Sequence, residues 1–157
     1  MVNYVMRDLD KENDVLFTKF IRGDKHDEES IVRQYQQNEN HNRQILRSNS
    51  NRMYMDILSF AKEDTPVLSN ETLTKIGRKY VQLRGKKAIS LCCVHRDKSH
   101  IHLHILLSAI DFKTGINNRL SREDFKSVKL EMEQYQLQFP EIQHSSIEHE
   151  KVKKKRR

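Results

Sequence analysis

The chain has 157 residues, 36% of them hydrophobic and 32% charged, which suits one domain with its own core and excludes a wholly disordered protein. No apolar run approaches the ~20 residues of a membrane span and no secretory signal is visible, so a soluble, cytoplasmic protein is expected. The 29 basic and 22 acidic residues give a net charge of +7, but six of the basic residues lie in 151–157, so net charge alone is weak support for a nucleic-acid partner.

The first half of the chain predicts three strands and a helix. Residues 1–6 and 15–22 have the β-branched and aromatic content of strands, and Gly23 ends the second of them. A polar helix is expected over residues 28–46, followed by a strand over residues 52–60.

The second half predicts two helices that flank a pair of strands. A helix over residues 69–83 has its apolar side chains at spacings of three and four, and strands follow over 87–95 and 100–110. The last helix is expected over residues 121–139, where Pro140 prevents its continuation. The order β-β-α-β-α-β-β-α predicts an α+β fold, an antiparallel sheet with packed helices.

The domain organisation follows from the same features. Residues 1–148 are expected to form one domain, and residues 149–157 a flexible basic tail that adds salt-sensitive affinity for polyanions.

The most informative feature is a cluster of histidines at His95, His100, His102 and His104. Side chains alternate along a strand, so the last three share one face, and His95 ends the preceding strand. Three imidazoles from two neighbouring strands could bind a divalent metal, with Asp97 accepting an N–H from a ligating ring or binding the ion itself. The alternative is a row of surface histidines, and the pattern does not decide which two of the last three would bind.

Residues 95–104 have the spacing His-x-Asp-x4-His-x-His, which resembles the third motif of conjugative relaxases, the mobilisation endonucleases of the HUH superfamily. Residues 53–60 are similar to that family's strand ending in Leu-Ser-Phe, and residues 114–121 to the loop after its motif. The similar segments together span most of residues 4–145.

This resemblance implies an HUH-endonuclease fold with a ferredoxin-like core. It also implies a DNA relaxase, which nicks one strand at an origin of transfer and so starts the mobilisation of a plasmid or other mobile element. The metal ligands would be His95, His102 and His104, holding Mg²⁺ or Mn²⁺, with Asp97 as the acidic partner and His100 as a neighbour only. The partners would be single-stranded or supercoiled DNA and accessory mobilisation proteins.

Relaxases attack the scissile phosphate with a tyrosine and form a 5′-phosphotyrosine link. Tyr35, Tyr80 and Tyr135 lie on expected helices, where core packing is their expected role. Tyr4 resembles the tyrosine of the family's first motif and is the favoured nucleophile, with Tyr54 as the alternative.

Two sets of polar residues are candidate DNA contacts, although a solvated helix face would explain the first equally well. The first set follows the first expected helix and comprises Arg43, Arg47 and Arg52. The second set lies in the loop after the histidine strand, where we expect it to reach a substrate at the metal, and comprises Lys113, Asn117, Asn118 and Arg119.

Two other functions are compatible with these residues. One is a non-catalytic DNA-binding module of the same fold. The other is a metal-dependent nuclease in which water attacks and no covalent intermediate forms.

Overall fold

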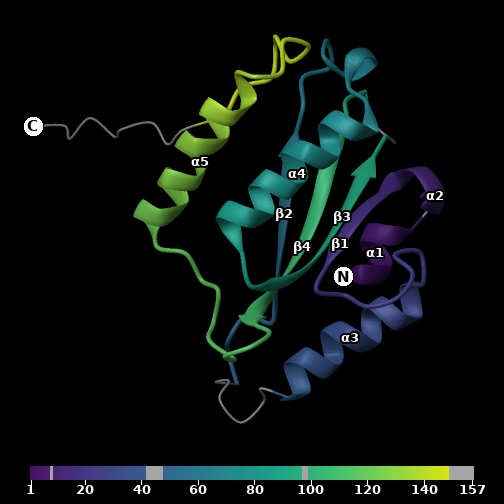
Figure 1. Ribbon diagram of the computed structural model, residues 1–157, viewed down its shortest axis with the longest axis vertical. Helices are drawn as coiled ribbons and strands as arrows, with labels where there is room; N and C mark the ends of the chain where they lie inside the picture. The colour runs from purple at the N-terminus through teal and green to yellow at the C-terminus, as the bar shows by residue number, and fades with distance from the viewer. Residues whose placement is uncertain (8, 42–47, 97–98, 149–157) are drawn as a thin grey trace, which may run out of the picture.

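The computed structural model describes residues 1–7, 9–41, 48–96 and 99–148 (Figure 1). Its centre is a four-stranded sheet with the spatial order β1-β3-β4-β2, in which each pair of neighbours is antiparallel. The strands are β1 (Val15–Lys19), β2 (Met53–Ser59), β3 (Ala88–His95) and β4 (His102–Asp111). The expected α+β architecture, an antiparallel sheet with packed helices, is confirmed.

Helices pack on both faces of this sheet and create two hydrophobic cores. Side chains of α4 and α5 form one core with Leu103, Ile105 and Leu107 of β4. Side chains of α1 and α3 form the other with Leu106 of β4 and Cys93 of β3. The helices are α1 (Val2–Met6), α2 (Lys11–Asp14), α3 (Glu28–His41), α4 (Asn70–Arg84) and α5 (Arg122–Gln136), with a short 3₁₀ turn at Thr65–Val67.

The two long helices on the first face begin at serine N-caps. The Ser69 hydroxyl accepts a hydrogen bond from the backbone N–H of Thr72, and the Ser121 hydroxyl accepts one from Asp124. These helices and α3 confirm the three expected helices, although residues 42–47, at the expected end of α3, lie outside the described residues.

The prediction of a strand over residues 1–6 is wrong, because Val2–Met6 forms a helix. Val2, Val5 and Met6 are buried, and their spacing of three and four places them on one face of the helix. Tyr4, on the other face, is 58% exposed. The strand-forming composition of this segment is overridden by the packing of that face onto the second core.

The second expected strand is shorter than predicted, because β1 ends at Lys19 rather than at residue 22. Phe20 has a φ of +57°, in the left-handed region that bulky residues rarely adopt. This residue turns the chain out of the sheet.

A buried carboxylate, Asp64, ties the end of the described chain to the connection between β2 and α4. It is 1% exposed. Its oxygens accept hydrogen bonds from the backbone N–H groups of Gln143, His144 and Ser145, the last at 2.7 Å, and from the Ser145 hydroxyl at 2.6 Å. Burial opposes ionisation, but these hydrogen bonds outweigh it and hold the pKa of Asp64 below its ordinary value.

We therefore expect Asp64→Asn to lower the free energy of unfolding by about 2–4 kcal/mol, because an amide NH₂ would face several N–H donors. In the wild type, the contribution of Asp64 is present above the ordinary carboxyl pKa of 3.8 and is lost as the pH falls through the lower folded value. Urea unfolding at neutral and acidic pH measures both effects. The exposed neighbour is the control: a loss as large in Glu63→Gln would contradict this assignment.

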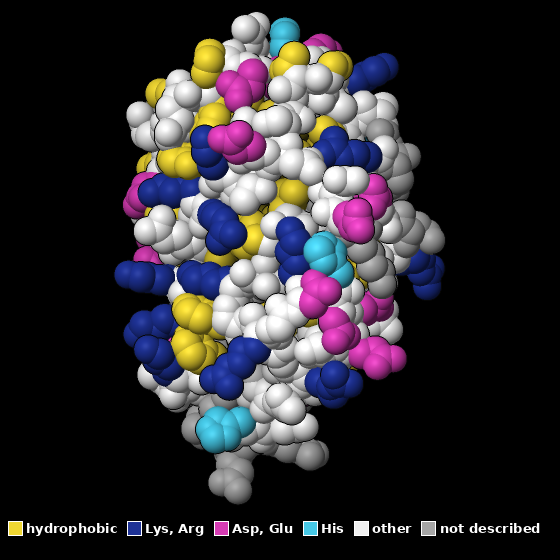
Figure 2. Space-filling view, turned by 45° about the vertical axis from the view of Figure 1, so that its right-hand side comes forward, with side chains coloured by type: hydrophobic (Ala, Val, Ile, Leu, Met, Phe, Trp, Pro, Cys, Tyr) yellow, Lys and Arg dark blue, Asp and Glu magenta, His cyan; other side chains and the backbone are white. Residues whose placement is uncertain are grey.

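Acidic and basic side chains are mixed over the surface, as Figure 2 shows for one face. In the lower left of that view, Lys and Arg side chains gather around a small hydrophobic patch. Within the part of the chain that the structure describes, no helix is both long enough and apolar enough to cross a membrane.

Candidate metal centre

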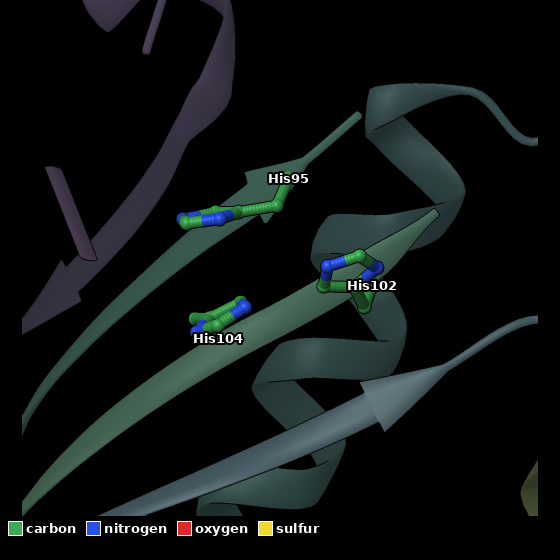
Figure 3. A group of neighbouring side chains, drawn as sticks. All are labelled: His95, His102 and His104. Carbon is green, nitrogen blue, oxygen red and sulfur yellow. The ribbon is translucent and has the colours of Figure 1, made fainter. Parts of the chain in front are cut away.

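The β3–β4 pair brings three of the four clustered histidines together. His95, the last residue of β3, lies directly opposite His102, the first residue of β4, and Cys93 lies opposite His104. Because side chains alternate along each strand, all three imidazoles lie on the face that carries α1, and they point toward one another (Figure 3).

The geometry of these three side chains fits a metal ion. One potential ligand atom of each residue lies within 4.8 Å of the others. The rings of His95 and His104 stack with centroids 3.9 Å apart, and the His102 ring lies 5.3 Å from that of His104. His102 and His104 are almost fully buried, at 6% and 4% exposure. Three neutral nitrogen donors on two adjacent strands leave coordination positions for a substrate.

The His95 ring is oriented by the backbone of α1. Its Nε2 lies 2.8 Å from the carbonyl oxygen of Val5. A carbonyl oxygen can only accept, so Nε2 carries the proton and, in the neutral ring, Nδ1 keeps its lone pair. Such a hydrogen bond fixes the tautomer and orientation of a metal-binding histidine.

The same helix places Tyr4 beside the histidines. The Tyr4 ring centroid lies 6.2 Å from that of His104, with the rings tilted by 57°, and the side chain is exposed. Consecutive residues of α1 thus serve the same site, since the Val5 carbonyl holds one imidazole and the Tyr4 phenol lies near another.

Tyr54 lies on the opposite face of the sheet. It pairs with Leu107, which belongs to the core under α4 and α5. Its hydroxyl donates to Asn117 at 3.2 Å, and the guanidinium of Arg84 lies 4.7 Å from its ring centroid. This placement favours Tyr4 over Tyr54 as the residue that could act at the histidines. Tyr35 and Tyr80 are buried and Tyr135 packs against the core, as expected.

Two other residues of the sequence motif stand apart from the cluster. The ring of His100 lies 5.3 Å from that of His102, but His100 is not among the three residues whose ligand atoms converge. Asp97, the expected acidic partner, lies outside the described residues.

The site is covered on one side and open on the other. Helix α1 lies over the β3 side, whereas the edge strand β2 continues the histidine face with Ser59 opposite His102 and Ile57 opposite His104. Ile57 is 49% exposed and the next residue on this face, Met55, is 37% exposed. The exposed part of the histidine face therefore lies over β2.

A buried thiol lies beside the histidines, outside the group of three residues whose ligand atoms converge. Cys93 is fully buried beside His104, and burial, followed by the charge of Asp14, raises its pKa to about 12. Both cysteines are free.

The described candidate DNA contacts lie toward the other end of β4 from His102, and Asn118 folds back to hydrogen-bond with Ser108 and Ala109 of that strand. Strand β4 runs ten residues from His102 to Asp111, about 30 Å at ~3.3 Å per residue, and the loop with Lys113, Asn118 and Arg119 follows its far end. Arg52 lies at the same end, where its carbonyl accepts a hydrogen bond from Ala109. Whether this loop contacts DNA bound at the histidines stays a prediction. Arg43 and Arg47 lie outside the described residues.

Asn118 of this loop belongs to a network of polar contacts with α4, β2 and β4. The buried guanidinium of Arg84 donates to the Asn118 carbonyl at 3.0 Å and forms an ion pair with Asp56 at 3.1 Å. Tyr80 donates to the same carboxylate at 2.7 Å, and burial, reinforced by Asp56, raises the pKa of Tyr80. The amide of Asn118 donates to Ser108 at 3.3 Å. Both the carbonyl and the side-chain amide of Asn118 thus hold this loop against the fold.

Two features of the site were not predicted from the sequence. They are the carbonyl of Val5 and the helical form of the segment that carries it. The apolar spacing of Val2, Val5 and Met6 was the available signal.

Comparison with known proteins gives one match. The family model for the relaxase MobA/VirD2-like nuclease domain matches residues 4–140. No curated protein and no solved structure gives a significant match.

Proposed function

Because the chain belongs to the family of MobA/VirD2-like relaxase nuclease domains, we propose that it nicks one DNA strand by transesterification at its three-histidine site. In this proposal His95, His102 and His104 bind a divalent metal ion and Tyr4 is the nucleophile. The DNA would be single-stranded or locally unwound, at the origin of transfer of a mobile element, where accessory mobilisation proteins would assist.

The observation that supports the proposal most strongly is that the Tyr4 phenol lies next to the three imidazoles. Helix α1 holds Tyr4 exposed, with its ring 6.2 Å from that of His104, while its next residue orients His95. Tyr54, the other tyrosine that sequence similarity offered, has the sheet between it and the histidines.

The proposed reaction exchanges one phosphodiester bond for another. The phenol oxygen of Tyr4 gives up its proton to solvent and forms a bond to the scissile phosphorus, while the bond from phosphorus to the 3′ oxygen breaks. The 3′ oxygen takes a proton and leaves as the 3′-hydroxyl of the upstream fragment. The 5′-phosphate of the downstream fragment stays linked to Tyr4. No bond is hydrolysed, so a later 3′-hydroxyl can reverse the step and rejoin a strand without ATP.

The histidines supply the binding site for the ion. When bound, a divalent metal would neutralise charge on the non-bridging phosphate oxygens. Mg²⁺ or Mn²⁺ is the expected ion, and three imidazole donors favour Mn²⁺ or Zn²⁺ over Mg²⁺ by ligand preference.

The test needs no knowledge of the target sequence. A pool of single-stranded oligonucleotides with a randomised internal region is incubated with the protein and Mn²⁺, and DNA that stays attached after denaturation is sequenced. We expect a single enriched motif whose 5′ end is linked to protein. Free 5′-phosphate ends without an adduct would indicate attack by water, and enrichment under native conditions alone would indicate a binding module without nuclease activity.

A further inference from the structure

A pair of phenylalanines lies at the end of the sheet opposite the histidines. Phe20 follows β1 and Phe112 follows β4, and their ring centroids are 4.2 Å apart with an interplanar angle of 33°. Phe112 packs against the core formed by α1 and α3, whereas Phe20 is 44% exposed. One aromatic ring is thus anchored and the other is presented to solvent.

Lysines surround this pair. The ammonium groups of Lys19 and Lys113 lie 5.1 and 5.6 Å from the ring centroids of Phe20 and Phe112 respectively. Lys19 also donates to the carbonyl of Lys86 at 2.7 Å, and the carbonyl of Lys87 accepts the backbone N–H of Phe112. We call this set, Lys19, Phe20, Lys86, Lys87, Phe112 and Lys113, the Phe–Lys patch.

The Phe–Lys patch combines an unusual backbone conformation with repulsion among its cations. Phe20 keeps an exposed ring on a left-handed backbone, a conformation that bulky residues avoid. Burial and then the positive charge of Lys86 lower the pKa of Lys19, so the cations here repel one another. The nearby carboxylate of Asp111 is buried and accepts the backbone N–H groups of Lys113 and Thr114. An incoming anion would reduce the repulsion among the lysines.

We propose that the Phe–Lys patch binds single-stranded DNA outside the nick site, with a base stacked on Phe20 and phosphates near the lysines. An exposed aromatic ring bordered by cations is the usual platform for single-stranded nucleic acid, because every base offers a π face and every nucleotide a phosphate. The proposal rests on the proposed function, since it assigns a second contact to the same DNA strand. The length of β4 places this contact about 30 Å from the histidines, which is roughly nine nucleotides at the ~3.4 Å rise of a stacked strand.

A single tryptophan provides a direct test, because the chain contains none. Phe20→Trp is made in the Tyr4→Phe protein and titrated with oligothymidylate in EDTA, so that neither metal nor cleavage is needed. We expect saturable quenching of the tryptophan fluorescence as a base stacks on the ring. The matched control is Leu137→Trp, at a 74% exposed position at the end of α5, where we expect no quenching. Equal quenching in both variants, or in neither, overturns the proposal.

The lysines are tested through the salt dependence of binding. In fluorescence anisotropy, Lys86→Ala/Lys87→Ala is expected to bind oligothymidylate about tenfold more weakly and to reduce the slope of log affinity against log salt by about 1.4. Lys75→Ala/Lys126→Ala removes the same charge from exposed positions of α4 and α5 and should change neither quantity. An equal effect of both pairs, or binding of a duplex as tight as that of the single strand, overturns the proposal.

These measurements separate the two proposals. Quenching at position 20 in a protein that forms no covalent adduct would leave the Phe–Lys patch and remove the nicking function. If the protein nicks DNA but the fluorescence of its Phe20→Trp variant is not quenched, the nicking function stands and the Phe–Lys patch is ruled out.

Discussion

Tyr4→Phe is expected to abolish the covalent protein–DNA adduct and to reduce nicking at least about 10³-fold, because it removes the only oxygen of the attacking side chain. The measurement is denaturing electrophoresis of protein incubated with Mn²⁺ and the DNA strand selected from the randomised pool. Tyr4 is 58% exposed, so the loss of its hydroxyl should change the free energy of unfolding by less than about 0.5 kcal/mol. Lost activity can then be attributed to chemistry.

Tyr54→Phe is the matched control for this change. Its hydroxyl bonds to Asn117 on the other face of the sheet, so adduct formation should persist when it is removed. An adduct that forms in Tyr4→Phe but not in Tyr54→Phe would identify Tyr54, rather than Tyr4, as the nucleophile.

His102→Ala/His104→Ala is expected to eliminate Mn²⁺ binding at the proposed three-histidine site. Both removed rings belong to the group whose ligand atoms converge, and one imidazole alone cannot hold the ion. Affinity should fall more than about 100-fold, since changes to groups that merely orient metal ligands cost 10–100-fold. Isothermal titration with Mn²⁺, repeated with Mg²⁺ and Zn²⁺, measures the loss.

His100→Ala controls for the loss of a histidine beside the site. Its ring lies near His102 but outside the converging group, so the Mn²⁺ isotherm should be unchanged. Because His102 and His104 are buried, urea unfolding must show that the double variant is folded. An isotherm in the folded double variant equal to that of the wild type would rule out these histidines as ligands.

The sequence predicted those parts of the fold that repeat a pattern over many residues. The apolar spacing of α4 extends over fifteen residues, so it identifies both the element and its buried face. Strand β4 is buried along its whole length, and only its start alternates in sequence. Alternation over residues 100–104 predicted that His100, His102 and His104 share one face, with His95 on the adjacent strand, and the resemblance to relaxases then favoured His102 and His104 over His100. The convergence of three imidazoles was therefore accessible without a structure.

Local patterns were less informative where tertiary packing decides. Helix α1 has only five residues, and its valines and tyrosine favour a strand until its apolar face packs onto the second core. The face of Tyr54 depends on the register of β2 against β4, which no residue near it specifies. The distance between the loop after β4 and the histidines also depends on the fold, because the loop turns back and Asn118 hydrogen-bonds to Ser108 and Ala109 of β4.

Peptide mapping of the covalent adduct by mass spectrometry tests the account most directly. Protein is incubated with Mn²⁺ and the selected strand, digested with protease and nuclease, and searched for peptides that carry a nucleotide. The account predicts a nucleotide 5′-phosphate on the peptide that contains Tyr4, formed with Mn²⁺ and absent in EDTA. A nucleotide on Tyr54, or cleaved DNA with no modified peptide, would contradict it.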